Sequence, residues 1–409
     1  MSRAQARRFR WPALLAVAVA TVSGFSVMPA RPAAAETRAD AGFGRFIEEL
    51  WPEAQAAGIT RATFDAAFRG VVPDPKVAAL TRKQAEFSRP IWDYVAGSVS
   101  PARLVKGADM AERWASTLDT VERVYGVPRH VVLAVWGMES GFGANAGGLY
   151  VVRSLATLAH LRYRGDFFRG ELIEALRILQ DGQVDRAGLK GSWAGAMGQT
   201  QFMPSSFRDF AVDGNGDGRR DIWTNVPDAL ASTANYLREK GWRADLPWGF
   251  EVAVPGNIDL GTTKRAFAGW SESGVERLDG RPMPRTGEAS LFLPTGVRGP
   301  AFLVSDNFQV IRAYNSSDAY ALGVGYLANR LSGAGPLARA WPVGEPSLGP
   351  AERKEVQSRL STLGLYKGEA DGRHGAVTRD AIRAFQGRAG LVADGYADWA
   401  VLKALRGAR

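Results

Sequence analysis

A stretch rich in glycine, proline and alanine, from Gly333 to Pro350, divides the sequence into two parts of unequal length. This composition is typical of a linker, because glycines and prolines interrupt both helices and strands. The parts on either side carry separate apolar patterns, so each part can bury a core of its own. We therefore predict a large domain over residues 36–332, a linker over 333–349 and a small domain over 350–409.

The chain of 409 residues has no cysteine, which removes several ways of holding a fold together. The absence excludes a disulfide framework, a thiolate metal site, a cysteine nucleophile and a lipidated N-terminal cysteine. The three histidines are too scattered for the spacing of zinc ligands. Burial must therefore stabilise the chain, and a hydrophobic content of 46% is enough for one large core and one smaller core.

The first 35 residues have the pattern of a secretory signal peptide. Arginines at positions 7, 8 and 10 precede an apolar run from Trp11 to about Val27, and three alanines end at Ala35. An uncleaved anchor is the alternative, but serines, a threonine and a glycine after Val19 weaken a run that would need about 20 apolar residues. We predict cleavage after residue 35, export to the periplasm and no transmembrane segment in the mature chain.

The mature chain has only a small excess of positive charge. Removal of residues 1–35 takes away five arginines and no acidic residue, so the formal charge falls from +9 to +4. A nucleic-acid interface needs lysines and arginines concentrated on one face or along one helix. No such cluster is visible in the sequence, and we expect no nucleic-acid partner.

Apolar residues recur at helical spacing in the first third of the large domain and again over residues 319–331. Pro128 begins a strongly apolar helix that carries Glu139 near its C-terminal end, where glycines interrupt it. Between Phe250 and Phe308 the pattern changes to short runs typical of strands. We predict a mainly α, α+β large domain with a small β element, and three short helices in the small domain.

Glu139 has the surroundings that acid catalysis requires. It follows the apolar residues 131–138 and precedes Ser140-Gly141-Phe142-Gly143, a flexible segment that could admit a polymer. Burial beside apolar side chains would raise the pKa of its carboxyl and keep it protonated at neutral pH, as a general acid on a glycosidic oxygen must be. The alternative is a helix-terminal glutamate that only forms a salt bridge.

A second segment, residues 191–204, combines small residues with amides and aromatic side chains. Small residues let the backbone approach a ligand closely. Ser192 and Gln201 can form hydrogen bonds with sugar hydroxyl or acetamido groups. Tight packing between a helix and a loop is the alternative explanation for the glycines.

The two segments contain the motifs WGMESGFG at 136–143 and GAMGQTQFMPSSF at 195–207, followed by ALASTANYL at 229–237 and YNSS at 314–317. Two long motifs in this order are hard to obtain by chance. Together they resemble the membrane-bound lytic transglycosylase B family, in a soluble form without a lipid anchor. The resemblance covers residues 40–332 and implies a lysozyme-like fold.

The resemblance also implies the residues of the site. Glu139 would be the single acid and base, in a groove that binds the glycan strands of peptidoglycan. The family often has two adjacent arginines where this chain has Tyr163-Arg164, which puts the neighbouring contact in doubt. The implied glycan-binding residues are Ser192, Gln201, Tyr236, Tyr314, Asn315, Tyr320, Arg164 and Tyr94.

A single acid distinguishes this chain from ordinary glycosidases, which place two carboxylates across the scissile bond. The resemblance implies that the substrate replaces the second one. The 2-acetamido group of N-acetylmuramic acid (MurNAc) would stabilise C1, and Glu139 would then activate the C6 hydroxyl, leaving a 1,6-anhydro end without consuming water. Two alternatives stay open, a muramidase-type hydrolase that uses Glu139 and a non-catalytic scaffold that binds the wall.

The loop DGNGDGRRD at 213–221 fits the first nine positions of a calcium loop, with oxygen ligands at positions one, three and five and glycine at six. Position twelve is Thr224 instead of glutamate, so the last carboxylate would come from Asp228, as in the stretched loop of the family. A surface loop of Asx turns without metal is the alternative. We predict one structural Ca²⁺ and no organic cofactor, with the ligands Asp213, Asn215, Asp217, Arg219 through its backbone carbonyl, and Asp228.

Residues 350–409 resemble the small peptidoglycan-binding module of many wall enzymes, through LGLY at 363–366, ADGRHG at 370–375 and TRDAIRAFQ at 378–386. The resemblance implies that this module raises the local concentration of the enzyme at the wall. No individual contact residue and no protein partner can be read from the sequence.

Overall fold

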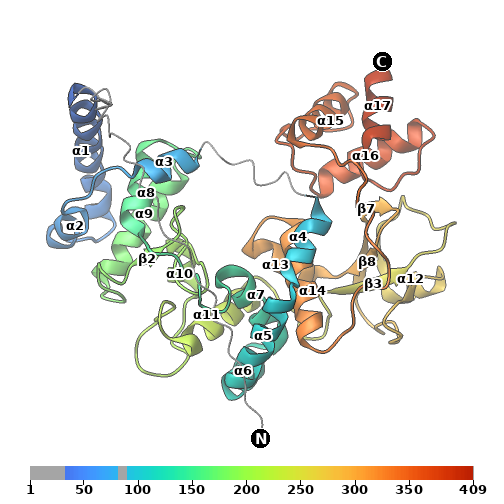
Figure 1. The fold of residues 1–409 in the computed structure, drawn as a ribbon, viewed down its shortest axis with the longest axis horizontal. Coiled ribbons are helices and arrows are strands. Elements are labelled where there is room, and N and C mark those ends of the chain that lie inside the picture. Colours follow the sequence, from blue (N-terminus) through green and yellow to red (C-terminus); the bar gives the residue numbers. More distant parts are fainter. Residues whose placement is uncertain (1–32, 82–89, 409) are drawn as a thin grey trace, which may run out of the picture.

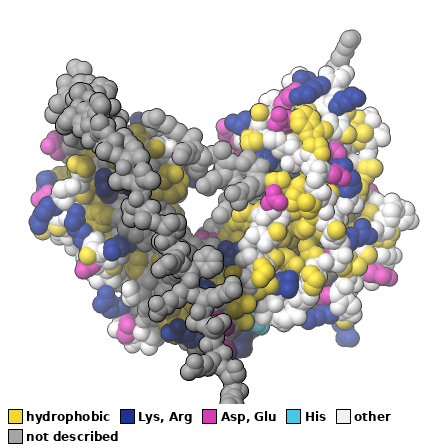
Figure 2. Space-filling model, viewed as in Figure 1, with side chains coloured by type: hydrophobic (Ala, Val, Ile, Leu, Met, Phe, Trp, Pro, Cys, Tyr) yellow, Lys and Arg dark blue, Asp and Glu magenta, His cyan; other side chains and the backbone are white. Residues whose placement is uncertain are grey.

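The computed structural model describes residues 33–81 and 90–408. Residues 1–32 of the predicted signal peptide lie outside the described residues. Within the two described ranges, none of the helices combines the length and the apolar character that a membrane crossing requires. Figure 2 shows lysines and arginines dispersed among aspartates and glutamates over the visible face of the molecule.

Two groups of helices build most of the large domain (Figure 1). The first group packs around the pair α8 and α9. It consists of α1 (Ala33–Ala56), α2 (Arg61–Phe68), α3 (Pro75–Leu80), α8 (Val151–His160), α9 (Phe167–Gln180) and α10 (Pro204–Phe210).

The second group surrounds α7, and contacts between α10 and α11 join it to the first. It consists of α4 (Ile91–Ser98), α5 (Pro101–Arg113), α6 (Ala115–Tyr125), α7 (Arg129–Ser140), α11 (Val226–Glu239), α13 (Asp306–Tyr314) and α14 (Asp318–Leu331).

Helix α7 lies at the centre of the second group because it is apolar on every side. All residues from Val131 to Gly137 are buried, and α5, α6, α11 and α14 pack around them. The helix begins after Pro128 and ends at Gly141, whose φ of 59° is a left-handed conformation that glycine adopts without strain. Glu139 therefore lies in the last turn, where the buried helix reaches the surface.

The β element lies between α11 and α13, as the sequence predicts. Its five antiparallel strands have the order β4-β6-β8-β3-β5, and they are β3 (Gly249–Ala253), β4 (Lys264–Ala266), β5 (Glu276–Arg277), β6 (Glu288–Phe292) and β8 (Ala301–Val304). With α12 (Phe267–Glu272), the sheet encloses its own apolar cluster around Trp270. The short strand β7 (Pro294–Val297) follows β6 outside this sheet.

A second, two-stranded sheet pairs β1 (Leu149–Tyr150) with β2 (Lys190–Gly191). In it Leu149 lies opposite Gly191, immediately before Ser192. The pairing brings the chain that follows α7 next to the start of the second sequence motif.

The C-terminal domain consists of α15 (Pro350–Thr362), α16 (Ala376–Arg388) and α17 (Trp399–Gly407). Its core includes Val356, Ile382 and Leu402, and also Leu348 from the end of the predicted linker. The mainly helical fold, with its small β element and its three-helix C-terminal domain, confirms the fold class predicted from the sequence.

Candidate active site

The carboxyl of Glu139 lies in the last turn of α7, partly accessible to solvent but closely surrounded by protein atoms. The Tyr320 hydroxyl, on the first turn of α14, donates a hydrogen bond to Glu139 Oε1 at 2.5 Å. Burial raises the pKa of Glu139 to about 7, because a carboxylate loses water contacts there, and the Tyr320 hydrogen bond opposes the rise by stabilising the charged form. Near neutral pH, Glu139 therefore exists in both protonation states.

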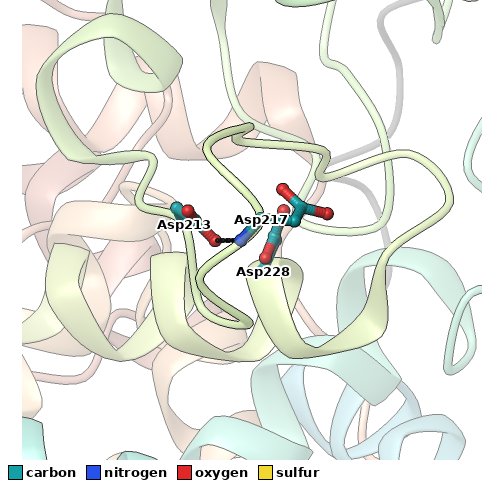
Figure 3. A group of neighbouring side chains, drawn as sticks. All are labelled: Asp213, Asp217 and Asp228. Atoms are coloured by element: carbon teal, nitrogen blue, oxygen red, sulfur yellow. Dashed lines mark hydrogen bonds between the residues drawn. The ribbon is translucent and has the colours of Figure 1, made fainter.

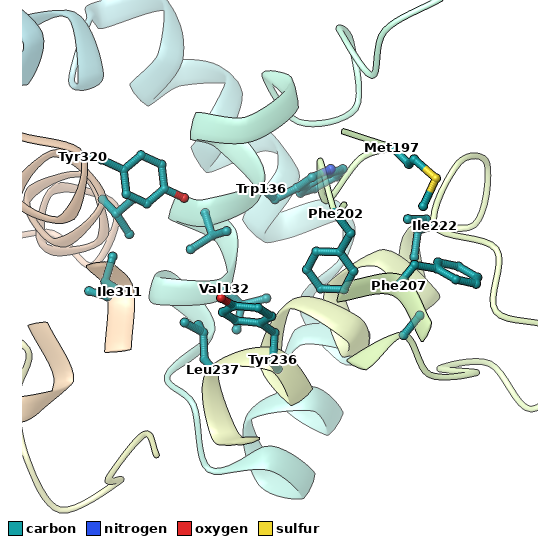
Figure 4. Packing of buried hydrophobic residues seen from close by; sticks show 14 of the residues in the cluster. Val132, Trp136, Met197, Phe202, Phe207, Ile222, Tyr236, Leu237, Ile311 and Tyr320 are labelled. Carbon is teal, nitrogen blue, oxygen red and sulfur yellow. The ribbon is translucent and has the colours of Figure 1, made fainter. Parts of the chain in front are cut away.

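A row of aromatic rings runs from Glu139 into the core. Tyr320 lies 6.5 Å from Tyr314 with nearly parallel rings, Tyr314 lies 4.7 Å from Tyr236, and Tyr236 lies 5.6 Å from Phe202, measured between ring centroids. Figure 4 shows Tyr320 with its hydroxyl directed from α14 toward α7, and Tyr236 and Phe202 packed farther along. The row connects α14, α13, α11 and the second motif, and its packed rings form a rigid layer of side chains beside Glu139.

The hydroxyls of this row are fixed as donors. Tyr314 donates to the carbonyl of Thr200 at 2.6 Å, and Tyr236 donates to the carbonyl of Ala313 at 2.7 Å. Burial raises the pKa of Tyr236 to about 12, and that of Tyr320 well above its ordinary value. Tyr320 consequently keeps its proton near neutral pH and can donate a hydrogen bond to the Glu139 carboxylate.

Gln201 joins the second motif to the loop after α7. Its Nε2 donates to the carbonyls of Ala146 at 3.0 Å and Gly198 at 2.9 Å, and its φ of 51° marks a tight turn. Ser192 stabilises the same segment, because its Oγ accepts a hydrogen bond from Ala196 N at 3.1 Å. The structure thus brings the two predicted segments together.

Gln199 is a structural residue of the site that sequence reasoning missed. Its Oε1 accepts from Trp136 Nε1 at 3.0 Å, and its carbonyl accepts from Ser140 Oγ at 2.8 Å. A Cβ at Gly143, where φ is 80°, would lie 2.5 Å from Gln199 Oε1, so only glycine fits there. Nothing in the motif distinguishes the role of this glutamine from that of Gln201, because both are amides adjacent to Thr200.

Two cations of α5 were also missed. Lys106 Nζ donates to the carbonyl of Gly141 at 2.7 Å, at the end of α7. Arg103 Nη1 donates to the carbonyl of Gly97 at 2.7 Å and lies 3.8 Å from Met138 Sδ. Their spacing in the sequence is ordinary for a helix, so only the folded chain shows that they contact the C-terminal end of α7.

The remaining predicted glycan-binding residues have different environments. Tyr94 of α4 is 37% exposed, and burial together with the nearby Glu139 charge raises its pKa to about 12, which places it at the site. Asn315 is exposed directly after α13. Arg164 is exposed in the turn between α8 and α9, with its guanidinium 5.5 Å from the Tyr163 ring centroid, and no contact within the described ranges connects it to Glu139.

No second carboxylate within the described ranges affects the pKa of Glu139. Glu171 is a buried glutamate elsewhere in the large domain, but its oxygens accept hydrogen bonds from Ser205 N at 3.0 Å and Ser205 Oγ at 2.7 Å. It therefore caps α10. The site offers one proton-exchanging carboxyl supported by one tyrosine.

The predicted calcium loop brings three carboxylates together. Oxygens of Asp213, Asp217 and Asp228 lie within 4.8 Å of one another (Figure 3). Asp228, in the first turn of α11, is fully buried and accepts hydrogen bonds from Gly214 N at 2.9 Å and Asp221 N at 2.7 Å. Burial raises its pKa, and the nearby carboxylates add to the rise. Such crowding of acidic oxygens suits a hard divalent cation.

The other two predicted calcium ligands lie in the same loop. Asn215 Oδ1 accepts from Asp217 N at 3.1 Å, and Arg219 N donates to Asp217 Oδ1 at 2.9 Å. Asp213 accepts from Gly218 N at 2.7 Å, and this and neighbouring backbone hydrogen bonds lower its pKa. Hydrogen bonds from the backbone therefore hold the side-chain oxygens of the loop close together, as the ligands of a cation would be.

The mainly helical domain, with a glutamate at the end of its central helix hydrogen-bonded to a tyrosine, belongs to the lysozyme-like class of proteins. The model of the family described as Transglycosylase SLT domain matches residues 42–329, and that of the Putative peptidoglycan binding domain matches residues 350–405. The chain belongs to the transglycosylase SLT domain family, which confirms the resemblance seen in the sequence.

Known relatives agree with this assignment. Membrane-bound lytic murein transglycosylase B of Escherichia coli K12 is 34% identical over 242 residues, which are 57% of this chain and 65% of that protein. The chain thus spans just under two thirds of that relative.

Solved structures of two bacterial proteins are also similar to this chain. SltB3 of Pseudomonas aeruginosa, crystallised with NAG-anhNAM-pentapeptide, is 46% identical with a TM-score of 0.84, covering 89% of this chain and 99% of that chain. Slt35 of Escherichia coli in complex with calcium is 28% identical with a TM-score of 0.60, covering 72% of this chain and 93% of that chain.

Proposed function

We propose that this protein is a peptidoglycan lytic transglycosylase. It would cleave the β-1,4 bond between MurNAc and N-acetylglucosamine (GlcNAc) and leave a 1,6-anhydroMurNAc end, with Glu139 as acid and base. The observation that carries the proposal is the raised pKa of Glu139, about 7, in a site where Tyr320 alone among the described residues is hydrogen-bonded to its carboxyl. The relatives support it, since one is a lytic murein transglycosylase and another was crystallised with an anhydro muropeptide.

In the proposed reaction, protonated Glu139 gives its proton to the glycosidic oxygen as the bond from C1 breaks. The acetamido oxygen of MurNAc bonds to C1 and takes up the developing positive charge. The Glu139 carboxylate, stabilised by Tyr320, then removes the proton of the C6 hydroxyl. O6 displaces the acetamido oxygen at C1, and Glu139 is again protonated without any water consumed.

We propose different roles for the predicted glycan-binding residues. Tyr94 and Asn315 are exposed and can contact sugar groups directly. The hydroxyls of Tyr236 and Tyr314 already donate to backbone carbonyls, so these residues would shape the groove with their rings. Ser192 and Gln201 would present the second motif to the glycan, and Arg164 would meet it farther from Glu139.

A calcium ion would be structural in this proposal. Asp213, Asn215, Asp217, Asp228 and the carbonyl of Arg219 would hold it, and its charge would offset the three clustered carboxylates. The calcium complex of Slt35 supports this assignment. The ion would connect the loop to the first turn of α11, which carries Tyr236 at its other end.

The proposal places the enzyme in the periplasm, where an exported chain meets peptidoglycan. Residues 350–409 would bind the wall as a peptidoglycan-binding domain, and the linker over residues 333–349 would connect them to the catalytic domain over residues 36–332.

The test is mass spectrometry of soluble muropeptides released from purified sacculi by the mature protein and by Glu139→Gln. We expect products lighter by one water than reducing-end muropeptides, absent with the variant, while both proteins bind sacculi equally. Reducing ends would identify a muramidase-type hydrolase. Binding without any release would identify a scaffold, and release by Glu139→Gln would exclude Glu139 as the acid.

A further inference from the structure

The C-terminal domain contacts the large domain at the first turn of α14. Arg379 of α16 forms an ion pair with Asp318, the first residue of α14. Arg312 of α13 contacts the other carboxylate oxygen of Asp318 at 2.6 Å. The side chains of Arg379, Asp318 and Arg312 are 19%, 15% and 25% exposed, so the cluster is largely shielded from water.

The position of Asp318 depends on both arginines. A carboxylate with so little exposure loses hydration, and removing one of its partners leaves part of its charge uncompensated. Arg379 is held in place by two further contacts, a hydrogen bond from Nη1 to the carbonyl of His374 at 3.1 Å and a distance of 5.3 Å from its guanidinium carbon to the Phe292 ring centroid. Both polar contacts of Arg379 come from Nη1, so a lysine would keep the charge and one donor group, but it would lose the planar guanidinium that lies beside the Phe292 ring.

The same turn of α14 carries the tyrosine that contacts the catalytic carboxyl. Ser317 caps the helix, and its Oγ accepts a hydrogen bond from Tyr320 N at 3.3 Å. Tyr320, two residues after Asp318, donates to Glu139 at 2.5 Å. Since the backbone of one helical turn moves as a unit, a displacement of Asp318 also displaces the Tyr320 hydroxyl.

We propose that Arg379 of the C-terminal domain is a positioning residue for the reaction at Glu139. It holds Asp318, Asp318 fixes the first turn of α14, and that turn keeps the Tyr320 hydroxyl on the Glu139 carboxyl. The C-terminal domain then supports turnover itself, in addition to any binding of the wall. This inference rests on the proposed function, in which Glu139 is the acid and base.

The interface offers a matched control. Arg298, which follows β7, contacts Asp398 of the C-terminal domain at 3.0 Å and Glu345 at 2.7 Å. Asp394 accepts a hydrogen bond from Val297 N at 3.2 Å beside it. Arg298→Ala therefore removes an ion pair between the same two domains without touching α14.

The experiment measures kcat and KM on soluble glycan oligomers, with binding to sacculi measured separately, for the full-length mature chain. We expect Arg379→Ala to lower kcat about five- to tenfold, since a misplaced catalytic contact is costly, while KM and sacculus binding change less than about twofold. Arg379→Lys should recover part of kcat, and Arg298→Ala should keep the wild-type value.

A second background separates positioning from general loosening. Tyr320→Phe removes the hydroxyl through which Arg379 is proposed to act, so adding Arg379→Ala to it should lower kcat no further. A wild-type kcat for Arg379→Ala, an equal loss for Arg298→Ala, or a full additional loss in the Tyr320→Phe background would each overturn the inference.

Two measurements keep the outcomes distinct. Thermal unfolding identifies a variant that fails to fold. If Arg379→Ala does not fold, Arg379→Gln, which removes the charge but keeps a polar side chain, takes its place, and a normal kcat for Arg379→Gln would overturn the inference. Product mass reports on the proposed function separately, because reducing-end products from the wild type would refute transglycosylation while kcat would still test Arg379.

Discussion

Glu139 is poised between an acid and a base because two opposing effects act on one carboxyl. Burial raises its pKa to about 7, and the hydrogen bond from Tyr320 limits the rise. Tyr94 and Tyr314 also face this charge, and their own raised pKa values keep them neutral near pH 7. Lys106 and Arg103 contribute positive charge from α5 at the end of α7. A pH profile therefore reports mainly on Glu139.

The first prediction concerns that profile. Activity should fall as pH rises through about 7, because the protonated form of Glu139 must donate to the leaving oxygen. Tyr320→Phe removes a hydrogen bond that stabilises the carboxylate, so the pKa of Glu139 should rise further and the alkaline limb of kcat/KM should move to higher pH, with a lower maximum. Rates on soluble glycans from pH 5 to 9 measure both, and a limb that moves to lower pH would contradict the assignment.

The second prediction links the same carboxyl to stability. Its pKa is raised from 4.5 to about 7 on folding, so its stabilising contribution is complete below pH 4.5 and is lost as pH rises through about 7. Glutamine cannot ionise, so Glu139→Gln should not lose stability as pH rises. The free energy of unfolding of the variant should exceed that of the wild type by up to about 3 kcal/mol at pH 8, but not at pH 4. Urea unfolding of both proteins at pH 4 and pH 8 measures this difference in stability. The same difference at both pH values would refute the burial of the Glu139 charge.

The role of a single residue could be predicted from the sequence only where that role depends on its neighbours in the chain. Glu139 stands at the end of an apolar helix broken by glycines, and both features survive in the fold. Gln199, Lys106 and Arg103 acquire their roles from segments that meet only on folding, since Trp136 lies 63 residues from Gln199 and Gly141 lies 35 residues from Lys106. No spacing along the chain encodes such contacts.

At the scale of elements, the position of the β element was predictable but its strand order was not. Short apolar runs marked the strands between residues 250 and 308. The order places β8 between β6 and β3, with Leu303 opposite both Leu291 and Phe250. That register follows from packing of the sheet against α12 and Trp270, which the sequence pattern does not specify.

The calcium loop gives the third prediction. Three carboxylates within 4.8 Å repel one another, so Ca²⁺ should stabilise the chain by binding the folded loop, by about 3 kcal/mol at a hundredfold excess over its Kd. Asp217→Asn should abolish the gain, whereas Asp109→Asn, an exposed aspartate of α5, should keep it. Thermal unfolding with Ca²⁺, Mg²⁺ or chelator measures the effect. An equal gain in both variants would place the ion elsewhere.

At the scale of the whole molecule, the composition of residues 333–349 predicted a linker, but the structure holds its first half against the large domain. Leu337 and Trp341 pack against the large core, and Leu348 packs into the C-terminal core. Arg379 meets Asp318 across 61 residues of sequence. Composition identifies a segment without regular structure, but it does not show whether neighbouring surfaces bind that segment.

The last prediction concerns how firmly this connection is held. The Glu251 carboxylate of β3 accepts hydrogen bonds from Ala338 N at 2.7 Å and Arg339 N at 2.8 Å. Glu251→Ala removes both acceptors, so the segment should detach more often and trypsin should cleave after Arg339 several-fold faster. Glu276→Ala, an exposed glutamate on the adjacent strand β5, should leave the cleavage rate unchanged. Rapid cleavage of the wild type would show instead that the segment is free and that the two domains are joined only through Arg379, Arg298 and their neighbours.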